Sequence, residues 1–325
     1  QIPYHVQIES DGSGTIRYAA RGDTDRDFGA VARVVPSAGD ANAPPPVPLA
    51  HEGGIHIEGA ERVLIVIKMF VDERRDNAWM DLTHELNEVT MDYETLLAAH
   101  AAEHGERFTR VELDLGGKEQ DHALSNEELL LDAYQGEAST ALVETMWAYG
   151  RYLLISSSRP GGLPCPLHGK WCGAYHGFWT FNMANENLQM IYWQSLSGHL
   201  AETHLPVFDY YDRMMEDFRE NARKIYGCRG IFIPAVTTPA SGLLRTVKPH
   251  IIHWTGAAAW LGQHYYDYYL YTGDEDFLKN RAFPFLRETA LFYEDFFTIG
   301  PDGKFVSAPS NSPENTPGNL WDGRG

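Results

Sequence analysis

The sequence predicts a mixed fold, in which the last strands of a β-sandwich are followed by the first helices of an (α/α) toroid. Residues 1–72 contain short apolar runs separated by glycine and proline clusters, a pattern typical of strands. From Ser139 onward, apolar residues recur at helical spacing, and long loops rich in glycine, proline and aromatic residues separate the helices. Helix pairs joined by such loops indicate a toroid.

The first part of the chain, residues 1–72, is expected to consist of strands. The runs are Tyr4–Ile8, Thr15–Ala19, Ala30–Val35, Gly53–Glu58 and Arg62–Val71. Because the last run is rich in Val and Ile, we expect it to be buried. These strands are too few for a complete sandwich, so we expect the domain to begin before Gln1.

Residues 73–135 are interpreted as a connector. Apolar residues on one face predict a helix over Asp92–Phe108, and Arg110–Leu115 alternates like a strand. Asp121–Glu128 is polar and acidic, which is typical of a solvated linker.

Residues 136–325 are expected to form the first part of a helical catalytic domain. The predicted helices are Ser139–Ser156, Leu188–Ala201, Leu205–Ile225, His250–Tyr271 and Glu275–Phe297. Ser139 is a suitable N-cap for the first of them, and Pro284 is expected to break the last.

Composition excludes several classes of function. The net charge of −19 argues against nucleic-acid binding, and no apolar run is long enough to cross a membrane. Cys165 and Cys172 flank His168, but their spacing matches no zinc pattern, so we expect neither a metal nor a cofactor. Aromatic residues make up 12% of the chain, which suits a carbohydrate site, although most of them should fill the core.

Two separated stretches carry the candidate chemistry. Asn185, Glu186 and Asn187 stand directly before a helical pattern, and Glu314 lies in a turn of Ser, Pro and Asn residues. Amides can hold a sugar, and a carboxyl group can protonate its leaving oxygen. Each residue also has an ordinary interpretation, since Asn185 could cap a helix and Glu314 could be a solvated loop acid.

Four motifs in a fixed order favour the catalytic interpretation. They are Tyr149–Pro164, Asn185-x-Asn187-x-Gln189-Met190-x-Tyr192-Trp193, Tyr271-Thr-Gly-Asp274 and Pro309-Ser-x-Ser-Pro-Glu-Asn315. The order resembles glycoside hydrolase family 95, whose known members include α-L-fucosidases and α-L-galactosidases. The resemblance extends from about Ala60 to Asn315.

The resemblance implies an inverting, exo-acting glycoside hydrolase that acts on a terminal L-sugar. The family has an N-terminal β-sandwich followed by a six-fold (α/α) barrel of twelve helices. Its motifs make Glu314 the general acid and make Asn185 and Asn187 the residues that position water. The family's catalytic base is an Asp from later in the domain. We therefore expect the rest of the domain beyond Gly325 to be a partner of this segment, which alone should be inactive and poorly soluble.

Other residues bear on the substrate. Family fucosidases carry a His-His-Asn-Thr-Asp segment where this chain has the mainly apolar Gly230–Gly242, so we expect a different sugar preference. Candidate substrate-binding residues are Trp179, His176, Trp193, Trp254 and His253, and core packing is an equally good interpretation of each. An inverting glycoside phosphorylase and a non-catalytic carbohydrate-binding relative remain as alternatives.

Overall fold

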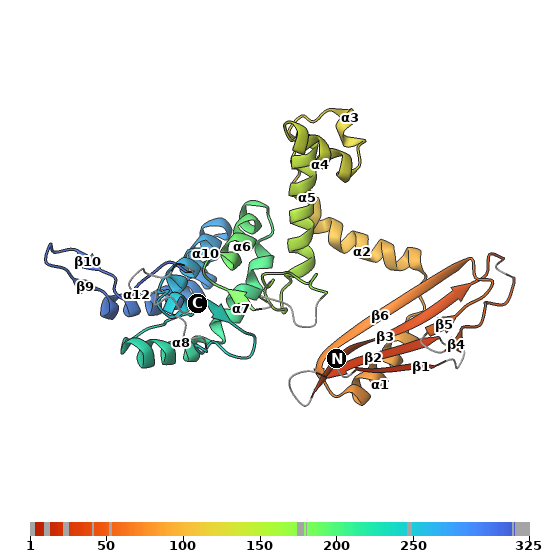
Figure 1. The fold of residues 1–325 in the computed structure, drawn as a ribbon, viewed down its shortest axis with the longest axis horizontal. Coiled ribbons are helices and arrows are strands. Elements are labelled where there is room, and N and C mark those ends of the chain that lie inside the picture. The colour runs from red at the N-terminus through yellow and green to blue at the C-terminus, as the bar shows by residue number, and fades with distance from the viewer. Residues whose placement is uncertain are drawn as a thin grey trace. The chain divides into compact units, whose positions relative to one another are not determined.

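The computed structural model describes residues 4–9, 14–21, 26–40, 42–51, 54–173, 179, 181–245, 249–313 and 315. The chain divides into two compact units, Gln1–Glu103 and His104–Gly325. The division falls inside helix α2 (Tyr93–Phe108), and helix α1 (Arg75–Asn87) packs on the strands of the first unit (Figure 1).

An antiparallel sheet is the centre of the first unit. Its strands are β1 (Tyr4–Glu9), β2 (Thr15–Arg21), β3 (Asp27–Ser37) and β6 (Arg62–Glu73), paired in the order β1-β2-β3-β6 (Figure 1). A separate ribbon pairs β4 (Leu49–His51) with β5 (Gly54–His56). The predicted strands are confirmed in all five regions.

Helix α1 covers one face of this sheet. Trp79 and Leu86 of the helix pack against Val31 and Phe70 of the sheet. On the other face, alternate residues of β6 are exposed, namely Val63, Ile65, Ile67, Met69 and Val71. The expectation that the Val/Ile-rich run is buried is therefore wrong for the residues that the structure describes, since α1 covers only the face that carries Phe70.

The second unit is rich in helices. In chain order they are α3 (Glu119–His122), α4 (Asn126–Gln135), α5 (Thr140–Ser157), α6 (Asn187–Ser197), a 3₁₀ turn (Ala201–His204), α7 (Leu205–Asp212), α8 (Met215–Asn221), a π turn (Ala222–Tyr226), α9 (Pro249–Ile252), α10 (Ala257–Thr272), α11 (Glu275–Phe277), a π turn (Leu278–Ala282) and α12 (Phe283–Phe296). Two short strand pairs accompany them: β7 (Asn182–Met183) with β8 (Val236–Thr237), and β9 (Thr298–Ile299) with β10 (Phe305–Val306).

The connector differs from its prediction. Arg110–Leu115 forms no strand, and the acidic run 121–128 contains the end of α3 and the start of α4. Ser125 and Glu128 form a capping box, in which the Ser125 hydroxyl accepts from the Glu128 N–H and the Glu128 carboxylate accepts from the Ser125 N–H. Leu129 packs beside Leu142 of α5. A reciprocal cap and one buried leucine thus give a helix where charge alone indicated a linker.

The predicted helix Leu205–Ile225 is divided after Asp212. The carboxylate of Asp212 accepts a hydrogen bond of 2.7 Å from the buried Tyr265 hydroxyl and pairs with Arg281 at 2.6 Å. Pro284 lies in the first turn of α12, directly after a π turn, where its missing N–H costs little. The backbone stays in the helical region through this π turn, so the predicted break at Pro284 is wrong, and only the hydrogen-bond pattern changes before the proline.

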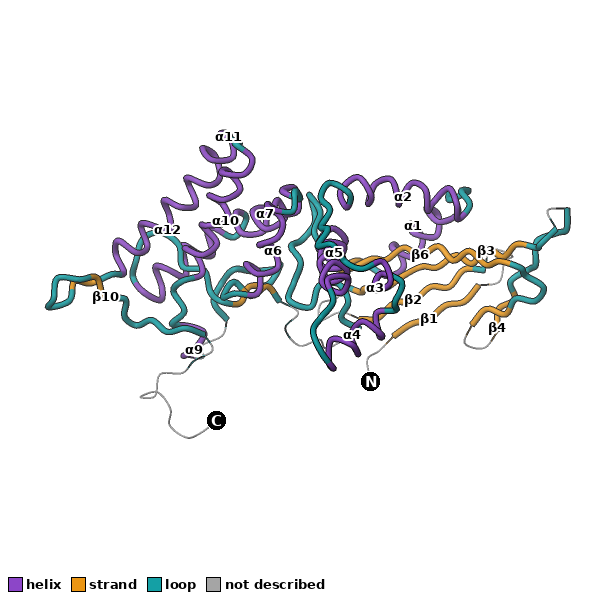
Figure 2. The backbone as a smooth tube through the Cα atoms, turned by 90° about the horizontal axis from the view of Figure 1, so that it is seen from above, coloured by secondary structure: helices purple, strands orange, loops and turns teal. Residues whose placement is uncertain are grey.

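Aromatic side chains fill the core of the second unit. Helix α10 contacts both α6 and α12 (Figure 2), and Tyr265 of α10 stacks on Phe285 of α12 with ring centroids 4.2 Å apart. Gly230 has a φ of +69°, and a Cβ there would lie 2.1 Å from the carbonyl oxygen of Glu288. Glycine is therefore needed for the segment before β8 to run against α12.

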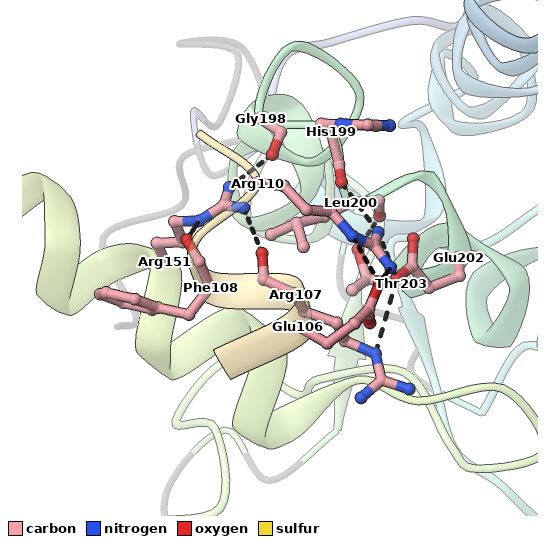
Figure 3. Close-up of polar contacts among 10 residues, drawn as sticks. All are labelled: Glu106, Arg107, Phe108, Arg110, Arg151, Gly198, His199, Leu200, Glu202 and Thr203. Carbon is pink, nitrogen blue, oxygen red and sulfur yellow. Dashed lines mark hydrogen bonds and ion pairs between the residues drawn. The ribbon is translucent and has the colours of Figure 1, made fainter. Parts of the chain in front are cut away.

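A buried arginine fixes the far end of α6. Arg151 of α5 is 2% exposed, and its guanidinium donates to the carbonyl oxygens of Phe108 (2.9 Å), Arg107 (2.5 Å) and Gly198 (Figure 3). Beside it, Arg110 donates to the carboxylate of Glu202 at 2.7 Å. The last carbonyls of α2 and the residue that ends α6 are thus held by one side chain.

Candidate active site

The short β7–β8 ladder positions the first motif. Asn182 and Met183 pair with Thr237 and Val236, and the N–H of Ala184 donates to the carbonyl oxygen of Ala235 at 2.7 Å. The turn that follows carries Asn185, and helix α6 begins at Asn187. The apolar segment around β8 therefore lies next to the motif that bears the two asparagines.

Gln189 holds this turn from inside the helix. Its amide nitrogen donates to the carbonyl oxygen of Ala184 at 2.7 Å, and its amide oxygen accepts from the N–H of Glu186 at 3.1 Å. Gln189 is completely buried, so both bonds are shielded from water. The glutamine of the motif therefore fixes the backbone between the two asparagines.

A pocket of about 470 Å³ opens at this turn. Its lining residues in the described part of the chain are Leu167, His168, Trp179, Met183, Asn185, Glu186, Asn187 and Pro313. The side-chain oxygen of Asn185 is buried and has no hydrogen-bond partner among the described residues. Buried polar atoms are nearly always paired, so this oxygen marks a place where a ligand or water is expected to bind.

The second motif reaches the same pocket through Pro313. The N–H of Asn311 donates to the carbonyl oxygen of His253 at 3.2 Å, and the hydroxyls of Ser310 and Thr255 lie 3.4 Å apart. The side chain of Asn311 also donates to the carbonyl oxygen of Asn315 at 3.0 Å. The structure thus brings the two motifs together at one pocket.

The remaining candidate residues have different positions. Glu314 and His176 lie outside the described residues, whereas Trp179 lines the pocket. His253 and Trp254 lie beside the Ser310–Asn311 segment, and each has a buried ring nitrogen without a partner in the described part of the chain. Trp193 is 58% exposed on α6 and is not among the described residues that line the pocket.

Sequence reasoning missed His168 and Glu186 as residues of this site. His168 was considered only with the nearby cysteines, and its ring stacks against Trp179 with centroids 6.1 Å apart. Glu186 was treated as part of the motif without a role. Their positions in the sequence could have indicated them, because His168 lies in the loop before the asparagine motif and Glu186 lies between the two asparagines.

Charge is low among the described residues that line the pocket. Among the described lining residues, Glu186 is the one acidic side chain, and none is Lys or Arg. No three His, Cys, Asp or Glu side chains of the described residues are placed to hold a metal ion.

The described helices include none with the length and apolar character needed to cross a membrane.

Comparisons with known proteins identify the family of this chain. The sequence profile described as "Glycosyl hydrolase family 95 catalytic domain" matches residues 92–322. "Alpha-L-fucosidase 2" of Arabidopsis thaliana is 34% identical over 233 residues, which is 69% of this chain and 27% of that protein. "Probable alpha-fucosidase A" of Aspergillus niger is 28% identical over 242 residues, 71% of this chain and 30% of that protein. The chain thus spans less than a third of the length of these relatives.

A solved structure shares the fold at low sequence identity. The "Putative kojibiose phosphorylase from human microbiome" superimposes with a TM-score of 0.60 at 13% identity, over 95% of this chain and 39% of that one. The helix-rich second unit is compatible with part of an (α/α) toroid. Since the family profile covers most of the sequence and includes both motifs at the pocket, the chain belongs to glycosyl hydrolase family 95.

Proposed function

We propose that this chain is part of an inverting, exo-acting glycoside hydrolase that releases a terminal L-fucose, L-galactose or related sugar from an oligo- or polysaccharide. The single observation that supports it best is the pocket lined by Asn185, Asn187 and Pro313. It gathers both motifs of the family in one place, and its volume of about 470 Å³ exceeds that of one sugar ring.

In the proposed mechanism, Asn185 and Asn187 hold the attacking water, and Glu314 protonates the leaving oxygen. The buried oxygen of Asn185, which has no partner among the residues that the structure describes, supports the first role, because it can accept a hydrogen bond from water. An amide does not take up a proton at neutral pH. A carboxylate from elsewhere in the protein is therefore proposed as the base, about 6.5–9.5 Å from the acid in an inverting enzyme.

Residues 136–325 are proposed to form the first part of a six-fold (α/α) toroid, with the sheet of residues 1–72 belonging to a β-sandwich. Apolar side chains on α5 and α6 support a further packing partner, because Met146, Tyr149, Met190 and Trp193 are all about half or more exposed. We propose that the remaining helices of the same catalytic domain cover them and provide the base.

A glycoside phosphorylase is the second candidate, because the structural neighbour carries that name. It would need cations or hydroxyls to bind phosphate beside the sugar. The described lining residues include no Lys, Arg, Ser or Thr, which favours hydrolysis. A non-catalytic carbohydrate-binding role would be indicated if the complete protein bound a glycoside of the panel below without releasing its sugar.

The test uses the complete protein and a panel of p-nitrophenyl glycosides of L-fucose, L-galactose and related sugars. We expect hydrolysis of at least one, with inversion at the anomeric carbon by proton NMR and no stimulation by phosphate. Asn185→Ala and Asn187→Ala should each lower kcat by about 10²–10³-fold, the usual loss when one group that acts on the transition state is removed. Phosphate-dependent release of a sugar phosphate would establish the second candidate instead.

A further inference from the structure

We propose that His168 is a specificity-determining residue, which contacts the hydroxyl groups of the bound sugar while Trp179 packs against the face of its ring. This inference deepens the proposed function and rests on it. The chemical class of the ligand is a neutral pyranose, since both ring nitrogens of an imidazole can meet hydroxyl groups, one as donor and one as acceptor.

Buried hydrogen bonds fix the start of the loop that carries His168. The N–H of Cys165 donates to the hydroxyl of Tyr192 at 2.8 Å, and that hydroxyl lies 2.6 Å from the hydroxyl of Ser158. The Ser158 hydroxyl in turn donates to the carbonyl oxygen of Thr203 at 2.8 Å. Tyr192 and Ser158 are both 1% exposed, so the chain of hydrogen bonds is sealed from water.

A tight turn then presents His168 at the pocket. The N–H of Gly169 donates to the carbonyl oxygen of Pro166 at 2.7 Å, closing the turn around Leu167 and His168. Gly169 has a φ of +62°, and its neighbour Trp171 leaves no room for a Cβ. The buried base and this closed turn give His168 a defined position, as a residue that selects among substrates requires.

The backbone and the exposure of Trp179 also indicate a binding site. Its φ is +52°, which is rare for a bulky residue and costs of order 1 kcal/mol in other proteins. The side chain remains 51% exposed at the pocket, although a large aromatic ring is most stable when buried. A strained backbone that holds an exposed indole against His168 is typical of a binding site for a flat apolar face, such as one face of a pyranose.

The test compares three substitutions at His168 in the complete protein. His168→Ala removes the whole imidazole ring. His168→Phe keeps an aromatic ring without hydrogen-bonding atoms, and His168→Gln keeps one hydrogen-bond donor and one acceptor without the ring. His122→Ala is the matched control, since His122 pairs with Glu144 at 3.2 Å and is not among the described lining residues. kcat and KM are measured on the best glycoside and on the next best, and thermal unfolding is followed for each variant.

For His168→Ala we expect KM to rise roughly tenfold on the best substrate, with a smaller loss of kcat, because the contact is made already in the ground state. The ratio of kcat/KM between the two sugars should fall severalfold. His168→Gln should restore more of that ratio than His168→Phe, and His122→Ala should match the unsubstituted protein.

Two results would overturn the inference. If His168→Ala keeps both KM and the sugar preference within about twofold while Asn185→Ala abolishes turnover, His168 does not contact the sugar although the proposed function stands. If the unsubstituted protein neither hydrolyses nor binds any glycoside of the panel, the proposed function fails, and the role of His168 fails with it.

Discussion

The backbone N–H of Asn311 donates to the carbonyl oxygen of His253, 58 positions earlier in the chain, and this bond fixes the second motif beside the segment that precedes α10. Pro313, two residues further on, lines the pocket that holds Asn185 and Asn187. The pairing explains how residues so distant in sequence come to line one pocket.

Acidification should unfold the protein through a buried histidine pair. His204 Nε2 and His264 Nδ1 lie 2.9 Å apart, and the ring of His204 also bonds the hydroxyl of Ser195. Burial lowers the pKa of His264 to about 4 and that of His204 well below its usual value. The unfolded chain therefore binds more protons than the folded one between about pH 6.5 and pH 4, and stability falls as pH decreases through that window.

The lowered pKa of His264 sets the size of this effect. It corresponds to a loss of roughly 3 kcal/mol in the free energy of unfolding by pH 4. Denaturant unfolding from pH 7.5 to pH 4.5 measures it. His264→Gln, which cannot become charged, should flatten the dependence, whereas the exposed His84→Gln should leave it unchanged. If stability depends on pH in the same way in His264→Gln and His84→Gln, the His204–His264 pair is not the acid-sensitive element.

Loss of Arg151 should destabilise the second unit strongly. Arg151→Met leaves the carbonyl oxygens of three partly buried residues without their donor, and each buried group left unpaired costs about 1–3 kcal/mol. We expect a loss of at least about 3 kcal/mol in the free energy of unfolding. Arg223→Met, which removes an exposed pair with Glu220, should change it by less than about 1 kcal/mol. Equal effects would contradict the structural role of Arg151.

How much of this arrangement could be predicted from sequence varies with its physical origin. The helix that begins near Ser139 was predictable, because Ser139 caps it and apolar residues recur on one face. The break after Asp212 was not, because it depends on a buried contact with Tyr265 and Arg281 from distant helices. The motif identified Asn185, while His168 joins the pocket through the Cys165–Tyr192 bond, which has no local sequence signal.

Sugar preference should differ from that of typical fucosidases. The segment with β8 lies beside the asparagine motif, and it is mainly apolar where family fucosidases have a polar cluster. Because each hydrogen bond to a hydroxyl contributes about 1 kcal/mol, the loss of two or three should lower kcat/KM for L-fucosides about 30–150-fold below that for the preferred sugar. The glycoside panel measures this ratio, and an L-fucoside as the best substrate would refute the expectation.

The most direct measurement compares Glu314→Gln with the unsubstituted complete protein on two substrates that share one sugar. One carries a 2,4-dinitrophenyl leaving group, which departs without a proton, and the other carries an alkyl leaving group, which requires one. If Glu314 is the general acid at this pocket, the alkyl glycoside should lose about 10²–10⁴-fold in kcat and the dinitrophenyl glycoside far less. Equal losses on both substrates, or none on either, would contradict the assignment of the active site.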